Sequence, residues 1–137
     1  MLRDRGWEVG SHTVTHALLT EVDDARLAAE LADSRRAIVE RLGACATLAY
    51  PYGIADARVA AAARSAGYLA ACTLTGAHVE DEPLRRPRVG MTSADTGRRL
   101  RAKLSPLGVA LRRSRAARTV RRLRPRRDWL PAAGGAG

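Results

Sequence analysis

Apolar and polar positions follow two alternating periods over the first two thirds of the chain. Short apolar runs predict strands at residues 7–10, 46–50 and 69–74, with a fourth opening at Arg88 and Val89. Longer segments with apolar residues three and four apart predict helices at residues 24–42 and 55–66. Strands separated by helices of this length indicate βαβ units, so we expect an α/β fold with a parallel sheet.

The predicted helix over residues 24–42 has recognisable ends. Asp23 and Asp24 supply a capping side chain and negative charge at its amino end. Gly43 follows the last apolar position, which is typical of a helix C-terminus. Residues 1–6 resemble the last turn and glycine stop of an earlier helix, so we expect the chain to begin inside an element of a larger domain.

Basic charge is concentrated near the C-terminus. The net charge is +10, and residues 98–127 hold thirteen Arg or Lys and no acid, whereas residues 1–97 hold eleven basic and thirteen acidic groups. We therefore predict two regions, a nearly neutral domain over residues 1–97 and an Arg-rich tail over residues 98–137.

The basic tail has two interpretations. Apolar residues are spaced loosely as a helix face at Leu104, Leu107, Leu111, Val120 and Leu123. A basic amphipathic helix can lie on anionic lipid or follow a nucleic-acid backbone. Equally, a disordered basic extension would only be solvated.

Cysteine content and hydropathy say little about the compartment. Cys45 and Cys72 lie in apolar, strand-like surroundings, which favours buried free thiols over a disulfide. The sequence shows no signal peptide and no run long enough for a membrane-spanning helix. The cell envelope and the cytoplasm both stay open as locations.

Two histidines, His12 and His16, directly follow the first predicted strand. Neutral imidazole is a common zinc ligand, and a spacing of four brings both rings to one point if the segment turns helically. A catalytic zinc site normally takes three protein ligands, so the third must come from elsewhere.

A second motif, Tyr50-Pro51-Tyr52-Gly53, ends the next predicted strand. Together with Ser-His-Thr-x-x-His, the helix between them, Glu30 and Ser34, it resembles the polysaccharide deacetylase (NodB-homology) family over roughly residues 2–89. The resemblance implies the C-terminal portion of the catalytic domain. The expected fold is a partial irregular (β/α) barrel with parallel strands that lacks the N-terminal strands, followed by a basic, helical or disordered tail.

The family resemblance implies a metal-dependent hydrolase that removes N-acetyl groups from the amino sugars of a polysaccharide. His12 and His16 would bind a divalent metal, zinc first and cobalt or nickel as alternatives, to activate water. Thr13 matches a position whose hydroxyl can orient an imidazole. Tyr52 matches the residue whose backbone N–H faces the developing oxyanion.

The resemblance also implies residues that bind the N-acetylated glycan. The side chains of Tyr50 and Tyr52 would line the sugar groove, while Pro51 and Gly53 would set the turn. Arg88, which enters the fourth predicted strand, would reach the carboxylates of the site, although a surface arginine beside a turn is the simpler interpretation.

Several departures from the family pattern predict that this chain alone is incomplete or inactive. The family's Asp-Asp motif, which supplies the catalytic base and the third metal ligand, has no match, and Ala49 stands where an arginine often begins the third motif. The late Leu-x-His motif is also missing, because His78 lacks the leucine and is typical of a solvated loop residue. The alternative function is a non-enzymatic remnant whose basic tail binds nucleic acid or an anionic membrane.

Overall fold

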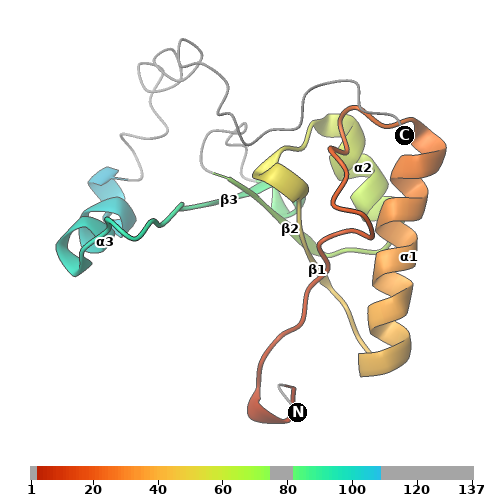
Figure 1. Ribbon diagram of the computed structural model, residues 1–137, viewed down its shortest axis with the longest axis horizontal. Coiled ribbons are helices and arrows are strands. Elements are labelled where there is room, and N and C mark those ends of the chain that lie inside the picture. The colour runs from red at the N-terminus through yellow and green to blue at the C-terminus, as the bar shows by residue number, and fades with distance from the viewer. Residues whose placement is uncertain (1–2, 75–81, 109–137) are drawn as a thin grey trace.

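Three short parallel strands form one sheet with two helices packed beside it (Figure 1). The computed structural model describes residues 3–74 and 82–108. Strands β1 (Thr47–Ala49), β2 (Ala70–Leu74) and β3 (Arg86–Arg88) lie in the order β1-β2-β3, and both pairings are parallel. The predicted α/β class with a parallel sheet is confirmed, and the fourth predicted strand forms slightly earlier than expected.

The predicted strand at residues 7–10 is wrong. The segment is irregular, and its link to the sheet is a parallel bridge from Ser11 to Leu48 of β1. The Ser11 N–H donates to the Thr47 carbonyl and the Ser11 carbonyl accepts from the Ala49 N–H, both at 2.9 Å. Within the described part of the chain this ladder begins only at Ser11, so the apolar run before it has no partner with which to form a strand.

The long helix α1 (Asp24–Leu42) has the bounds and ends that the sequence predicts. The Asp23 carboxylate caps it by accepting a hydrogen bond from the Arg26 N–H at 2.7 Å. Gly43 ends the helix in the left-handed conformation, with φ of 79° and its N–H bonded to the Val39 carbonyl.

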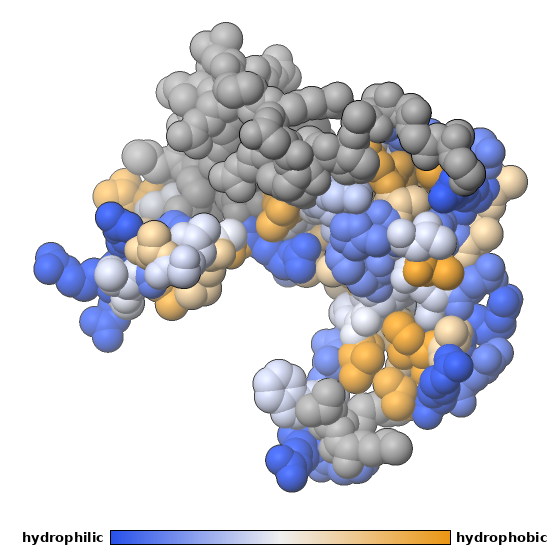
Figure 2. Space-filling model, in the orientation of Figure 1, coloured by the Kyte–Doolittle hydropathy of each residue, from blue (hydrophilic) through white to orange (hydrophobic). Residues whose placement is uncertain are grey.

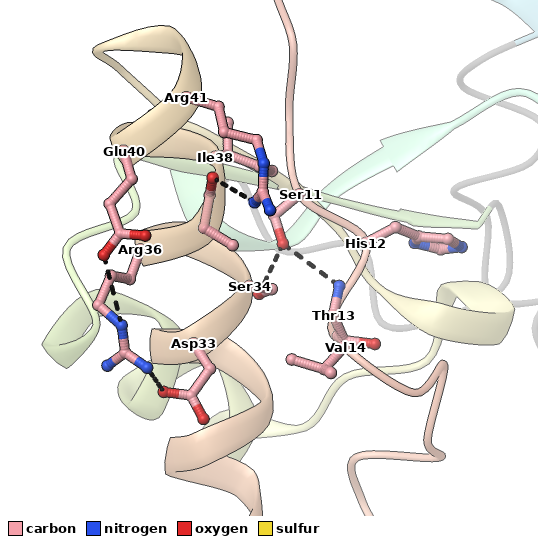
Figure 3. Close-up of a pocket in the computed structure, with 11 residues that line it drawn as sticks. Ser11, His12, Thr13, Val14, Asp33, Ser34, Arg36, Ile38, Glu40 and Arg41 are labelled. Carbon is pink, nitrogen blue, oxygen red and sulfur yellow. Dashed lines mark hydrogen bonds and ion pairs between the residues drawn. The ribbon is translucent and has the colours of Figure 1, made fainter.

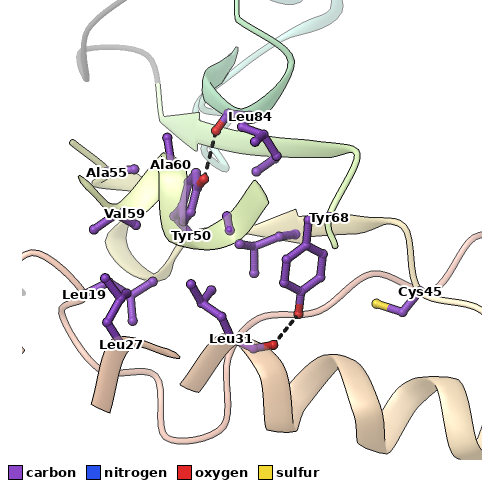
Figure 4. Close-up of a cluster of buried hydrophobic side chains, with 13 residues drawn as sticks. Leu19, Leu27, Leu31, Cys45, Tyr50, Ala55, Val59, Ala60, Tyr68 and Leu84 are labelled. Carbon is purple, nitrogen blue, oxygen red and sulfur yellow. Dashed lines mark hydrogen bonds between the residues drawn. The ribbon is translucent and has the colours of Figure 1, made fainter. Parts of the chain in front are cut away.

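The second helix, α2 (Ala57–Ser65), begins after Asp56, whose carboxylate accepts from the Val59 N–H at 2.8 Å. It lies against α1, and side chains from both helices meet residues of β1 and β2 in one buried cluster (Figure 4). The fully or nearly fully buried members from these elements are Leu27, Leu31, Leu48, Val59, Ala60, Ala63 and Ala71. This core fixes the positions of two segments, the one after Ser11 that carries the two histidines and the one after β1 that carries Tyr52.

Short 3-10 turns lie between and before the helices and strands. The first, η1 (Arg3–Arg5), ends at Gly6 with φ of 78°, in agreement with the predicted glycine stop. The second, η2 (Pro51–Gly53), directly follows β1, and the third, η3 (Pro83–Arg85), leads into β3.

The last described helix, α3 (Gly97–Leu104), stands apart on an extended arm after β3 (Figure 1). None of its residues is buried, and Leu104 is exposed. Figure 2 shows strongly hydrophilic side chains standing out from this end of the molecule. The helix begins at the predicted start of the basic tail, and Leu107, just beyond it, is also exposed. The other tail residues with predicted helical spacing, Leu111, Val120 and Leu123, lie outside the described part of the chain. A polyanion-binding role for the tail stays a prediction.

Cys45 is buried and Cys72 is half-buried, and both thiols are free. Among the described residues, no helix is long and apolar enough to cross a membrane.

Candidate active site

The two sequence motifs meet at the carboxyl ends of neighbouring parallel segments. His12 directly follows Ser11, which bridges to β1, and Tyr52 lies in the turn η2 that directly follows β1. Parallel strands bring their carboxyl ends to the same edge of a sheet, where α/β enzymes commonly place functional groups. The candidate residues therefore lie together at the edge of the sheet where the parallel strands end.

The ring of His12 is held by the backbone of β1. Its Nδ1 lies 2.5 Å from the Ala49 carbonyl oxygen. A carbonyl oxygen can only accept a hydrogen bond, so Nδ1 carries the proton and donates it. In the neutral ring, Nε2 then keeps the lone pair that a metal ion requires, and such a backbone contact is a usual way to orient a metal-binding histidine.

Three rings form a continuous row. The centroids of the His12 and His16 rings are 4.8 Å apart with an interplanar angle of 76°. The His16 ring in turn meets the Tyr52 ring edge to face, with centroids 4.6 Å apart and an angle of 74°. Both imidazoles are exposed, so the row opens to solvent.

The loop that carries the two histidines is irregular, which differs from the helical turn assumed from their spacing. Thr13 and His16 adopt left-handed backbone conformations, with φ of 70° and 59°. Non-glycine residues rarely adopt this region without support from surrounding contacts. The rings converge because this loop folds back, so the four-residue spacing is satisfied without a helix.

Tyr52 is also in the left-handed region, with φ of 56° and ψ of 1°. Gly53 follows it with φ of 67°, and a Cβ added there would lie 2.5 Å from the backbone nitrogen of Leu74 in β2. The prediction that Gly53 sets the turn is thus explained by a close approach of two backbones.

Thr13 supports His16 through the main chain. Its hydroxyl oxygen accepts a hydrogen bond from the His16 backbone N–H at 3.2 Å. The family resemblance implies a contact with an imidazole ring, whereas this bond shapes the loop between the two histidines.

A buried glutamate from α1 holds the middle of the histidine loop. The Glu30 carboxylate accepts hydrogen bonds from the backbone N–H groups of Val14 and Thr15, both at 2.9 Å, and from the Thr15 hydroxyl. Only 4% of Glu30 is exposed. Burial alone would raise the pKa of Glu30, but these hydrogen bonds, with the charge of Arg26, outweigh it and lower the pKa below the usual glutamate value.

A row of hydroxyl groups holds the start of the same loop. The buried Ser11 hydroxyl donates to the Ser34 hydroxyl of α1 at 2.8 Å and accepts from the Thr13 N–H at 3.2 Å. The Ser34 oxygen also lies 3.2 Å from the Tyr68 hydroxyl, which donates to the Leu31 carbonyl at 3.0 Å. These contacts join the loop to the helix and to the core.

An open groove of about 550 Å³ runs between the histidine loop and α1 (Figure 3). Its loop wall holds His12 and Val14, and its helix wall carries the charged row of Asp33, Arg36 and Glu40. In Figure 3 the His12 ring points away from α1, so this groove lies beside the histidine loop and not at the face where the two rings meet.

The side chain of Tyr50, predicted to line the sugar groove, belongs instead to the core. Tyr50 is 0% exposed and its hydroxyl donates to the Leu84 carbonyl at 2.9 Å (Figure 4). Pro51, predicted to set the turn, begins η2 and is also fully buried. Alternation along the strand directs Tyr50 inward, which leaves the half-buried Tyr52 as the aromatic residue of this turn that faces the histidines.

Arg88 is exposed at the carboxyl end of β3, and β2 separates it from the strand that precedes Tyr52. It shares the sheet edge with the candidate residues. His78 lies outside the described residues.

The donor set fits part of a metal site. Two imidazoles converge, and the hydrogen bond of His12 leaves its Nε2 available for an ion. Among the described residues no group of three His, Cys, Asp or Glu could hold a metal ion. These residues would therefore supply two nitrogen ligands, and the third ligand would come from elsewhere.

The sequence alone did not indicate that Glu30 holds the histidine loop through hydrogen bonds. Glu30 lies between Leu27 and Leu31 on the buried face of α1, and a charged residue at a core position is the signal that could have indicated a buried hydrogen-bonding role.

Known proteins resemble this chain in sequence and structure. A family model for polysaccharide deacetylases matches residues 1–71. A polysaccharide deacetylase from Bacillus cereus is similar at 25% identity with a TM-score of 0.66, covering 76% of this chain and 34% of that chain. The Streptococcus pyogenes deacetylase PplD, solved in complex with acetate, is similar at 20% identity with a TM-score of 0.63, covering 71% of this chain and 44% of that one.

No curated protein sequence matches the chain significantly. The chain spans less than half the length of the two solved structures, so its three-stranded sheet corresponds to part of their (β/α) barrel fold. The family model covers just over half of the chain. This protein therefore belongs to the polysaccharide deacetylase family.

Proposed function

We propose that this chain forms part of the active site of a metal-dependent hydrolase that removes N-acetyl groups from amino sugars of a polysaccharide. The observation that carries the proposal is the row of His12, His16 and Tyr52 at the carboxyl edge of the sheet. It combines two nitrogen ligands with an aromatic turn in a chain of the deacetylase family.

His12 and His16 are the proposed metal ligands. A divalent ion bound there, zinc first and cobalt or nickel as alternatives, would polarise the amide carbonyl and acidify a water molecule. The Ala49 carbonyl holds the His12 ring in the tautomer that presents Nε2, and Thr13 holds the backbone of His16. Both contacts reduce the reorganisation that ion binding requires.

Tyr52 is proposed to act through both its backbone and its ring. Its N–H would donate to the oxygen that becomes negative when the amide carbonyl is attacked. Tyr52 has a left-handed conformation directly before Gly53, which packs closely against Leu74, and this packing would hold the N–H in one direction before substrate binds. The half-buried ring would form a wall against the sugar, beside His16.

A third metal ligand and a catalytic base are needed for full activity, and the Asp-Asp motif that would supply them has no match in the sequence. We therefore propose that this chain alone is a weak or inactive catalyst. Arg88 at the same sheet edge is proposed to contact the substrate or the missing carboxylates.

The test is acetate release from N-acetylglucosamine oligomers in the presence of zinc, measured beside the variants His12→Ala and His16→Ala. The proposal predicts that release by the parent chain is slow or below detection, and that any release is lost in both variants. Release that continues unchanged in both variants would contradict it. Zinc binding without acetate release would support an incomplete site that holds its two ligands.

A further inference from the structure

We infer that Glu30 is a positioning residue that fixes the histidine loop for metal binding. The inference rests on the proposed function, because it assigns Glu30 a role toward His12 and His16. Glu30 itself lies on α1 and contacts the loop between them, at Val14 and Thr15.

The contacts of Glu30 are directed at one short segment. One carboxylate oxygen accepts both backbone N–H groups of Val14 and Thr15, and the other accepts the Thr15 hydroxyl. A buried carboxylate requires such donors, because without them the lost hydration of the charge is not replaced. The loop thus supplies the hydrogen-bond donors that the buried carboxylate requires, and the carboxylate in turn holds the backbone of the loop.

The same helix face also holds the other end of the loop. Ser34 lies one turn beyond Glu30 on α1 and bonds to the Ser11 hydroxyl, directly before His12. Glu30 fixes Thr15, directly before His16. Each histidine therefore follows a residue that is hydrogen-bonded to α1, which sets both rings relative to one rigid helix.

The backbone of the loop shows why this support matters. Thr13 and His16 both have positive φ values, a conformation that surrounding contacts must maintain. The two residues between them, Val14 and Thr15, are the ones that Glu30 holds. Loss of these bonds would let the loop relax and separate the rings of His12 and His16.

The decisive variant is Glu30→Gln, compared with Glu40→Gln on the exposed side of the same helix, where Glu40 has 66% of its side chain exposed. Two readouts are taken from folded protein. Amide hydrogen exchange at Val14 and Thr15 is measured without metal. Zinc is then titrated while the imidazole signals of His12 and His16 are followed by NMR.

Gln replaces the charged acceptor with a neutral amide, whose hydrogen bonds to the loop are weaker. The inference therefore predicts faster exchange at both amides in Glu30→Gln and zinc affinity reduced by about 10- to 100-fold, as for other supports of metal ligands. Glu40→Gln should match the parent protein in both readouts. Unchanged amide protection and zinc affinity in folded Glu30→Gln would overturn the inference. If the parent chain shows no zinc shift, the proposed metal site fails, while the exchange rates still decide whether Glu30 fixes the loop.

A second variant guards against misfolding of Glu30→Gln. Thr15→Val removes the hydroxyl donor and leaves α1 unchanged. We expect a smaller loss of amide protection in the same loop and a zinc affinity reduced by up to about 10-fold. If Glu30→Gln does not fold, amide exchange and zinc affinity in Thr15→Val that both match the parent protein would overturn the inference.

Discussion

The carbonyl oxygen of Ala49 accepts a hydrogen bond from the ring of His12, with Nδ1 and oxygen 2.5 Å apart. The contact joins the last residue of β1 to the first residue of the histidine loop. It fixes which ring nitrogen carries the proton, and so which nitrogen faces the candidate metal position.

The neutral His12 ring should therefore carry its proton on Nδ1. Nitrogen-15 NMR of the imidazole distinguishes the two tautomers directly, with free histidine as the reference. We expect the Nδ1–H form to dominate in the neutral ring. A neutral ring protonated on Nε2 would contradict the contact with Ala49.

Gly53→Ala should destabilise the fold strongly. The added methyl group would lie 2.4 Å from the Leu74 Cγ and 2.5 Å from its backbone nitrogen, at a φ of 67°. The positive φ and the overpacking together should cost about 2–4 kcal/mol of unfolding free energy. Urea unfolding measures the loss.

Gly90→Ala is the matched control for Gly53→Ala. An added Cβ at Gly90 meets nothing within 4 Å. We expect the unfolding free energy of this variant to stay within about 0.5 kcal/mol of the parent. Equal stability of the two variants would show that the close approach of Gly53 to β2 is not present in solution.

Tyr50→Phe should change the response of the fold to alkaline pH. Burial first, and then the negative charge of Glu82, raises the pKa of Tyr50 above its usual value. The phenol of the unfolded chain ionises near pH 10, while the folded phenol stays neutral, so stability falls as pH rises above about 10. The resulting decrease in unfolding free energy approaches about 1.4 kcal/mol per pH unit. Tyr50→Phe has no phenol at this position, so its stability should not show this decrease.

At neutral pH, Tyr50→Phe should itself cost about 1–3 kcal/mol, because the Leu84 carbonyl loses its buried donor. Denaturant unfolding at pH 7 and pH 11 gives both quantities. Parallel losses of stability for parent and variant between these pH values would contradict the buried position of the phenol.

Arg58→Ala should loosen the segment that leads from the histidine loop into α1. One guanidinium nitrogen donates to the carbonyls of Leu19 and Val22, both at 3.0 Å, and another pairs with Asp24 at 2.6 Å. Because the side chain is 38% exposed, solvent weakens these bonds, and we expect a loss of about 1 kcal/mol by thermal unfolding.

The exposed ion pairs of Arg36 with Asp33 and Glu40 provide the comparison for Arg58. Arg36→Ala should change stability by less than about 0.5 kcal/mol, because surface pairs contribute little. A larger loss of stability in Arg36→Ala than in Arg58→Ala would contradict the conclusion that the contacts of Arg58 contribute more to stability than the exposed ion pairs of Arg36.

The sequence predicted the helices because their signals are local. The apolar period, the Asp23 cap and the Gly43 stop together define α1, and each acts within a few residues of the helix end. The parallel sheet followed from the order of the elements. The segment at residues 7–10 shows the limit, because an apolar run becomes a strand only where a partner lies alongside.

The site was less predictable than the fold because its geometry depends on contacts between distant residues. Spacing suggested that His12 and His16 converge, but an irregular loop achieves this in place of a helical turn. Sequence could not show that the Tyr50 side chain is buried whereas Tyr52 faces the histidines. Nor could it show that Glu30, sixteen residues beyond Val14, holds the loop.

The most direct test of the account is calorimetric titration of the parent chain with zinc, beside His12→Ala and His16→Ala. The account predicts one zinc ion bound more weakly than in a complete three-ligand site, with binding lost in each variant. Tight stoichiometric binding lost in His12→Ala would contradict the predicted lack of a third ligand. Absent binding in the parent, or binding unchanged in both variants, would contradict the assignment of His12 and His16 as metal ligands.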